Sequence, residues 1–176
     1  MEGPADFSIR RATLQDIPAL VRHRCEMFRD MGQLREDAYP LLAEATAAYY
    51  AQAMPAGEYV AWVVSPASRP DVIVAGGGLQ LRRILPRPTR EGYLLKPGPQ
   101  GLIVNVYTEQ ECRRGGLGEM IMLTIIEWSK EHGVASLVLH ASDMGRPLYE
   151  RLGFTQTSEM SYPLARLNAT PQEGGA

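Results

Sequence analysis

The chain has 176 residues, of which 45% are hydrophobic and 22% are charged, and its formal net charge at pH 7 is −2. This composition is typical of a folded globular protein, and the length suits one domain with a sizeable core. The small negative charge argues against nucleic acid as a partner, because nucleic-acid-binding domains usually carry a basic surface.

The first part of the chain predicts one strand followed by two helices. Residues 8–12 can form the strand, and Thr13 with Asp16 approximates a capping box at the start of a helix. That helix is expected from about residue 14 to a stop at Gly32. An alanine-rich stretch predicts the second helix from about Tyr39 to Met54.

A β-hairpin is expected next. Residues 59–64 and 72–81 predict its two strands, and the segment between them is a loop. The glycines Gly76–Gly78 fit a strand only where there is a bulge or a close approach of another backbone. Residues 82–100 are rich in proline and cations, and a loop of this length is usually functional or mobile.

The second half of the chain alternates strands and helices. A buried strand over residues 102–107 leads through a polar turn and a glycine-rich corner into a helix that ends near Gly133. Residues 134–140 predict another strand, and Gly145–Leu152 a short helix. One or two closing strands are expected over Phe154–Leu164, where Pro163 indicates an edge position.

This order of elements predicts an α/β fold with a mixed central sheet flanked by helices. We expect one domain over residues 1–176, with a core at about 8–164 and a polar tail at 165–176. The two cysteines, Cys25 and Cys112, match neither a disulfide framework nor a metal site. No signal-peptide core or membrane-spanning apolar run is present, so a cytoplasmic protein without a membrane partner is expected.

The glycine-rich corner Arg113–Gly118 reads RRGGLG and stands directly before a helix. The first turn of a helix has free N–H groups and a positive dipole end, so this corner is suited to bind an anion. Neither the dinucleotide fingerprint nor the nucleotide-triphosphate loop is present. A kinase-like nucleotide binder is a weaker alternative, because the lysine and carboxylates that it requires are missing.

Two motifs together carry a family resemblance. The corner has the pattern Arg-x-x-Gly-x-Gly, and Gly145–Phe154 (GRPLYERLGF) is a short helix that carries a tyrosine and ends in Gly-Phe. In this order and spacing they resemble the two signatures of the GCN5-related N-acetyltransferase (GNAT) superfamily. The resemblance implies a mixed sheet of six or seven strands and acetyl-CoA as acetyl donor. The implied acceptor is a primary amine of a small molecule or peptide, and a homodimer is possible.

The resemblance also implies which residues bind the donor. The pyrophosphate is expected at the backbone of the loop, with a charge-assisted contact from one of the two arginines; the residues are Arg113, Arg114, Gly115, Gly116, Leu117, Gly118 and Glu119. For one arginine, solvent exposure is the alternative. The pantetheine arm is expected to pair with the backbone of Val106, Tyr107 and Thr108, where N–H groups can polarise the thioester carbonyl.

The resemblance further implies that Tyr149 is the catalytic residue, as the acid that protonates the leaving thiolate. A phenol with a pKa of roughly 10 is protonated at neutral pH and suits a thiolate of pKa roughly 8.5. The alternative is a packed tyrosine that only borders the cofactor. Ser142 is expected to hydrogen-bond the cofactor, unless it or Asp143 caps the short helix.

A general base is not assigned. Leu102 stands where some family members carry a strand glutamate, and Glu109 and Glu111 are interpreted as solvated turn residues. The missing glutamate leaves open a non-catalytic acyl-CoA-binding sensor or scaffold. The three histidines match no metal spacing: His140 is a weak candidate for a proton relay, and the other two, His23 and His132, are expected on helix surfaces.

Overall fold

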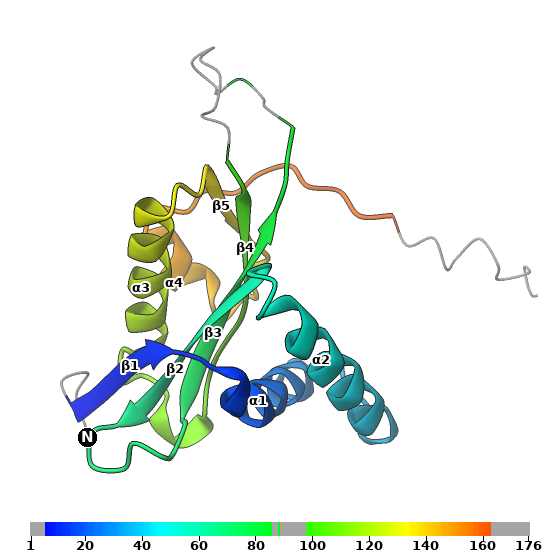
Figure 1. The fold of residues 1–176 in the computed structure, drawn as a ribbon, viewed down its shortest axis with the longest axis vertical. Coiled ribbons are helices and arrows are strands. Elements are labelled where there is room, and N and C mark those ends of the chain that lie inside the picture. Colours follow the sequence, from blue (N-terminus) through cyan, green and yellow to red (C-terminus); the bar gives the residue numbers. More distant parts are fainter. Residues whose placement is uncertain (1–5, 86–87, 89–97, 163–176) are drawn as a thin grey trace, which may run out of the picture. The chain divides into compact units, whose positions relative to one another are not determined.

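The computed structural model describes residues 6–85, 88 and 98–162. They fall into two compact units, Met1–His140 and Ala141–Ala176. The first unit holds a sheet and three long helices, and the second holds one short helix (Figure 1). One domain over the whole chain stays a prediction, and most of the loop expected at residues 82–100, like the tail at 165–176, lies outside the described residues.

The strands and helices follow closely the segments that the sequence predicts. In chain order they are β1 (Phe7–Arg11), α1 (Ile17–Asp30), α2 (Tyr39–Ala53), β2 (Tyr59–Pro66), β3 (Ala75–Arg82), β4 (Gln100–Thr108), α3 (Leu117–Glu131), β5 (Ser136–Leu139) and α4 (Arg146–Arg151). Between them, 3-10 turns lie at Leu14–Asp16, Glu36–Ala38 and Gln110–Cys112.

The five strands form one mixed sheet in the order β1-β2-β3-β4-β5. The first three pairings are antiparallel, and β4 pairs with β5 in parallel. Helices α1 and α2 cover one face of the sheet, and α3 covers the other (Figure 1). Buried residues from α1, α2 and β2, including Cys25, Tyr50 and Tyr59, fill the first side; Ile121 and Ile125 of α3 fill the second.

The expectation of six or seven strands was wrong for the described residues, which contain five. The closing strands predicted over Phe154–Leu164 are missing from residues 154–162, which have no regular structure after α4. A strand needs a neighbouring backbone and an apolar face to bury. In this segment Met160 and Tyr162 are 94% and 72% exposed, so the segment has no buried apolar face.

The start of α1 is fixed by a buried carboxylate. Asp16 accepts a hydrogen bond from the backbone N–H of Thr13 at 2.7 Å and from both terminal nitrogens of Arg10 at 2.8 Å. The Arg10 guanidinium lowers the pKa of Asp16 to about 2. The capping box predicted from Thr13 and Asp16 is therefore confirmed.

A bulge interrupts the pairing of β3 with β4. Gly76 faces Tyr107 and Gly78 faces Val104, so that two residues of β4 lie opposite the single Gly77. A Cβ at Gly78 would lie 1.8 Å from the Tyr59 hydroxyl oxygen. The glycine run thus provides the bulge that its composition indicated, and the group that approaches Gly78 closely is a side chain rather than a backbone.

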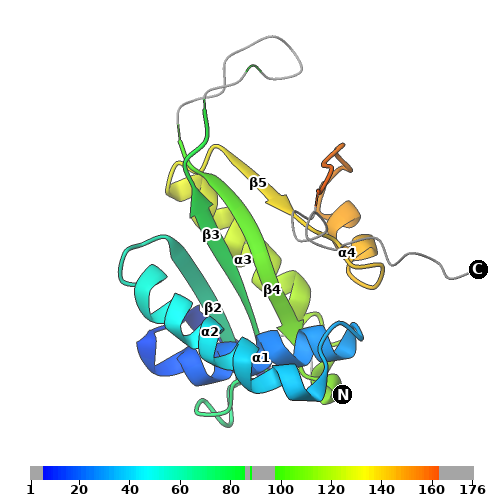
Figure 2. The same cartoon turned by 90° about the vertical axis from the view of Figure 1, so that its right-hand side faces the viewer.

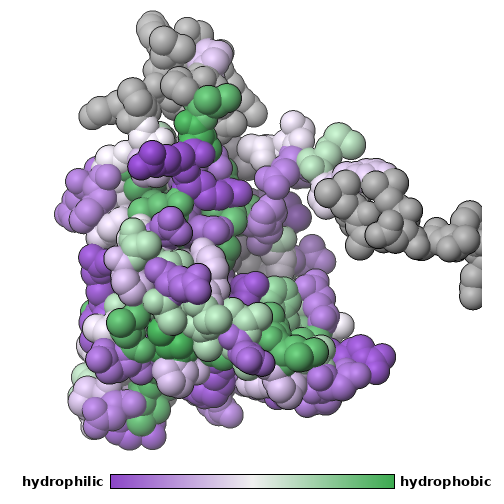
Figure 3. All heavy atoms as spheres, turned by 45° about the vertical axis from the view of Figure 1, so that its right-hand side comes forward, coloured by the Kyte–Doolittle hydropathy of each residue, from purple (hydrophilic) through white to green (hydrophobic). Residues whose placement is uncertain are grey.

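The molecular surface over α1 and α2 mixes hydrophobic and hydrophilic residues (Figure 3). On α2, Leu41 is 70% exposed and Tyr49 is 40% exposed. No helix in the described ranges has the length and apolar content that crossing a bilayer requires. Within the same ranges, no group of three or more His, Cys, Asp or Glu residues is arranged to hold a metal ion.

Candidate active site

The glycine-rich corner joins β4 to α3 and exposes backbone donors. Arg114 and Gly116 have φ angles of 66° and 79°, in the left-handed region, and Gly116 is the N-cap residue of α3. The first hydrogen bond of the helix is donated by Met120 to the Gly116 carbonyl at 3.0 Å. The N–H groups of Leu117, Gly118 and Glu119 precede this bond, so they are the donors that a helix start offers to an anion.

The two arginines of the corner lie in different surroundings. Arg113 donates from Nε to the Thr108 carbonyl at 3.0 Å, forms an ion pair with Asp30 of α1, and lies over the Tyr107 ring. Its guanidinium lowers the pKa of the Asp30 carboxyl. Arg113 therefore ties the corner to α1 and β4. Arg114 is exposed, so it is the arginine whose charge is available to a phosphate.

β4 pairs with β5 along only part of its length. The parallel register runs from Gln100–Ser136 to Ile103–Leu139 and ends there. Beyond this point β4 continues to Thr108, past the end of β5 at Leu139 (Figure 2). Residues 104–108 therefore present backbone groups on the β5 side to which an extended ligand can pair.

Asn105, at the bulge of β4, is held by three side chains. Its φ angle is 58°, a left-handed conformation that asparagine tolerates better than most residues. Its amide nitrogen donates to the hydroxyls of Tyr50 and Tyr59 at 2.8 and 3.3 Å, and its amide oxygen accepts from Arg24 at 2.5 Å. Burial raises the pKa of both phenols, so they stay protonated at neutral pH.

Glu109 follows β4 and contacts two side chains of α1. It accepts from Arg22 at 2.5 Å and lies 3.4 Å from Nε2 of His23. The expectation that His23 lies on a helix surface was wrong: it is 2% exposed, because it packs between α1 and the sheet beside Tyr107. Burial lowers the pKa of His23, so the imidazole is neutral near pH 7. His132, in contrast, is exposed and stacks on Trp128.

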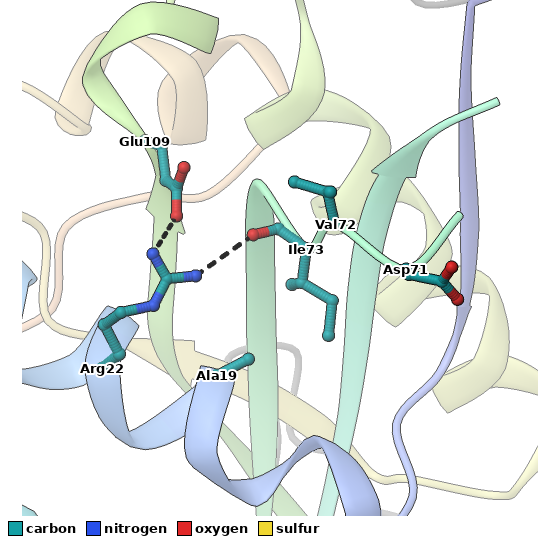
Figure 4. A pocket seen from close by; sticks show the side chains of 6 residues that line it. All are labelled: Ala19, Arg22, Asp71, Val72, Ile73 and Glu109. Atoms are coloured by element: carbon teal, nitrogen blue, oxygen red, sulfur yellow. Dashed lines mark hydrogen bonds and ion pairs between the residues drawn. The ribbon is translucent and has the colours of Figure 1, made fainter. Parts of the chain in front are cut away.

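An open hollow of about 300 Å³ lies beside the Arg22–Glu109 pair; its lining is Ala19, Arg22, Asp71, Val72, Ile73 and Glu109. Arg22 also donates to the Ile73 carbonyl, while Asp71 lies apart from the pair (Figure 4). The facing charges of Arg22 and Glu109 are thus already satisfied by each other. The hollow therefore adds no group to the candidate site.

The second unit carries Tyr149 on α4. Its ring makes an edge contact with Phe154 and lies so close to Gly145 that a Cβ there would be 2.9 Å from the ring. Burial raises the pKa of the Tyr149 phenol, which suits a proton donor. Ser142 accepts a hydrogen bond at 3.2 Å from the backbone N–H of Gly145, the N-cap residue of α4, and so lies in the turn before this helix.

Comparison with known proteins decides between the families that bind anions at such a corner. The model of the acetyltransferase (GNAT) family matches residues 20–154. The chain belongs to the GNAT family. Its enzyme class is accordingly that of the N-acetyltransferases.

Solved structures of other GNAT proteins resemble the chain over almost all of its length. A GCN5-related N-acetyltransferase from Ralstonia eutropha JMP134 is 30% identical, with 90% of this chain and 99% of that chain covered and a TM-score of 0.79. A predicted acetyltransferase with acetyl-CoA from Clostridium acetobutylicum is 26% identical, with coverage of 91% and 97% and a TM-score of 0.75.

A more distant likeness concerns the fold alone. Glucosamine-6-phosphate N-acetyltransferase from Arabidopsis thaliana is 18% identical, with 90% of this chain and 98% of that chain covered and a TM-score of 0.65. No curated protein sequence is significantly similar to the chain.

For this GNAT protein, the residues predicted from the loop and the strand lie on consecutive elements of one unit, from Val106 to Glu119. Their contacts with acetyl-CoA stay predictions, as do the roles of Tyr149 and Ser142. The network of Arg24, Tyr50 and Tyr59 around Asn105 was missed. The three lie 81, 55 and 46 residues from Asn105 in the chain. The available signal was Asn105 itself, a polar residue within an otherwise apolar strand.

Proposed function

We propose that the chain transfers the acetyl group of acetyl-CoA directly to a primary amine of a small molecule or peptide. The observation that carries this proposal is the continuous run from the open edge of β4 to the first turn of α3. It offers backbone groups to an extended arm at residues 104–108 and N–H donors to a pyrophosphate at residues 117–119. Arg114 supplies a charge-assisted contact to the phosphates.

The chain's own groups account for the steps of the transfer. The backbone N–H groups near Val106 and Tyr107 stabilise the charge that develops on the thioester carbonyl oxygen when the neutral amine attacks. The new C–N bond forms and the C–S bond breaks, and the leaving thiolate takes a proton from the Tyr149 hydroxyl. The nitrogen of the intermediate loses its extra proton to solvent, and the Tyr149 phenolate regains a proton from solvent, so that one amide and one free thiol are formed.

Glu109 is a poor candidate for the base of this reaction. Its carboxylate is bound by Arg22 and faces His23, and Leu102 occupies the strand position where some family members have glutamate. We therefore infer that the acceptor reacts as the neutral amine. We also propose a cytoplasmic location, a setting compatible with the free thiols of Cys25 and Cys112.

Calorimetric titration with acetyl-CoA, ATP and NAD tests the donor. We expect binding of acetyl-CoA alone, followed by release of free thiol when amines and peptides are added. A folded protein that does not bind acetyl-CoA would contradict the proposal. Binding without thiol release from a broad set of amines would instead support an acyl-CoA sensor or scaffold.

A further inference from the structure

Arg24 differs from the other two arginines of α1 in the groups that surround its positive charge. Arg22 pairs with Glu109 at 2.5 Å, and Arg29 pairs with Glu26 at 2.9 Å. Arg24 is half-buried, and its described partners are the uncharged amide oxygen of Asn105 and the ring of Phe28, 4.8 Å from the guanidinium carbon. Within the described ranges, no carboxylate forms an ion pair with it.

The groups around Arg24 leave its charge uncompensated. A guanidinium can only donate hydrogen bonds, so the Asn105 oxygen must face Arg24 and the Asn105 nitrogen must face the two phenols. The phenols of Tyr50 and Tyr59 are kept protonated by burial, so they add no negative charge. Only one of the five N–H donors of Arg24 is used in this network. The remaining donors suit a planar, bidentate contact with a carboxylate or phosphate.

The position of Arg24 connects it with the acceptor. Asn105, to which it is bonded, directly precedes the backbone of Val106–Thr108, where the acyl end of the donor is proposed to lie. The amine must approach this end of the donor for the C–N bond to form.

We propose that Arg24 binds an anionic group of the acceptor, so that the chain acetylates amines that also carry a carboxylate or a phosphate. This proposal rests on the proposed acetyl transfer and names the substrate class of the same site. The ion pair would position the amine and favour anionic acceptors over their neutral analogues.

Matched pairs of amines test this specificity in a thiol-release assay. The carboxylate arm compares amino acids with their carboxamides, and the phosphate arm compares phosphoethanolamine with ethanolamine. We expect the anionic member of at least one pair to have a kcat/KM about 10- to 100-fold higher, as for one charge-assisted contact. Substitution Arg24→Gln should abolish that preference, Arg24→Lys should keep part of it, and Arg29→Gln on the same helix should leave it unchanged.

Calorimetry with acetyl-CoA separates the two proposals. Unchanged donor affinity in Arg24→Gln shows a folded site, and a preference retained by that variant would overturn the role of Arg24. The role of Arg24 would also be overturned if the wild-type enzyme had a kcat/KM for the neutral amines equal to or higher than that for the anionic amines. If the wild-type protein does not bind acetyl-CoA, the proposed acetyl transfer itself is contradicted.

A substrate-independent measurement follows the Arg24 side chain by NMR. Inorganic phosphate or acetate, added to the CoA-saturated protein at millimolar concentration, should shift the Nε–H signal that Arg24→Gln removes. The Arg29 signal should move less, because that guanidinium is already paired with Glu26. Absence of a shift with both anions would overturn the proposed anion site.

Discussion

At the scale of single residues, Tyr149 is the side chain whose proposed role can be separated from packing. Its phenol is held against Gly145 and Phe154, and burial raises its pKa, so the hydroxyl is protonated at neutral pH. Replacing Tyr149 by Phe should lower kcat by roughly 10²-fold, the lower end of general acid catalysis, because the thiolate loses its proton donor. Steady-state kinetics measures kcat, and calorimetry should find a near-unchanged affinity for acetyl-CoA.

Tyr162→Phe is the matched control for this substitution. Tyr162 lies in the same unit and is 72% exposed, so removing its hydroxyl should leave kcat unchanged. Turnover of Tyr149→Phe at the wild-type rate would show that Tyr149 only packs beside Phe154.

The residues around Asn105 show where reasoning from the sequence ends. Glycines at positions 76–78 predicted a bulge or close approach, because few other residues fit there. No local rule connects Arg24 of α1 or Tyr50 of α2 with a strand more than fifty residues away. Such contacts depend on how helices pack on the sheet, and that packing is set by the whole core rather than by a motif.

At the scale of elements, a single substitution tests the corner before α3. Gly116 is the N-cap of α3 with φ 79°, a conformation in which a side chain is strained. Substitution Gly116→Ala should cost about 1 kcal/mol of unfolding free energy. It should also weaken acetyl-CoA binding by about tenfold, because the N–H donors of the first turn shift from the pyrophosphate. Urea denaturation and calorimetry measure the two effects.

Gly133 provides a control at the other end of the same helix. It has φ 67°, and a Cβ built there meets no atom within 4 Å, so Gly133→Ala introduces similar strain away from the corner. It should lower the unfolding free energy by a similar amount and leave acetyl-CoA affinity unchanged. Equal loss of affinity in both variants would mean that Gly116 acts through stability alone.

The elements themselves were largely predictable from composition and apolar pattern. β2 and α2 begin at the predicted residues, Tyr59 and Tyr39, because β2 is a continuous apolar run and α2 is rich in alanine, and a proline and a glycine separate the two segments. β3 begins at Ala75 rather than Val72, since the backbone N–H of Val72 is used in a turn to Arg69. The closing strands were expected from the residues of the segment itself, but residues 154–162 lack the buried apolar face that a strand needs.

At the scale of the whole molecule, His23, Asp16 and Asp30 make stability depend on pH on the acid side. Burial lowers the pKa of His23, which faces Arg22 and Glu109 and packs beside Tyr107, so the folded state binds its proton less readily than the unfolded state. This contribution is fully present above the unfolded value of 6.5 and is lost as the pH falls below it. Asp16, with its pKa of about 2, contributes above 3.8 and loses this contribution as the pH falls toward 2. The pKa of the Asp30 carboxyl is also lowered, so its contribution has the same sign as that of Asp16.

Unfolding free energy measured with urea should therefore fall in two steps as the pH decreases, the first beginning near 6.5 and the second near 3.8. Substitution His23→Gln, which keeps a polar side chain without a charge, should flatten the first step and leave the second. Asp16→Asn should leave the first step and reduce the second, to which Asp30 still contributes. It should also lower stability at neutral pH by about 1–3 kcal/mol, because Arg10 loses its charged partner. A first step of unchanged slope in His23→Gln would assign the pH dependence to another group and contradict the lowered pKa of His23.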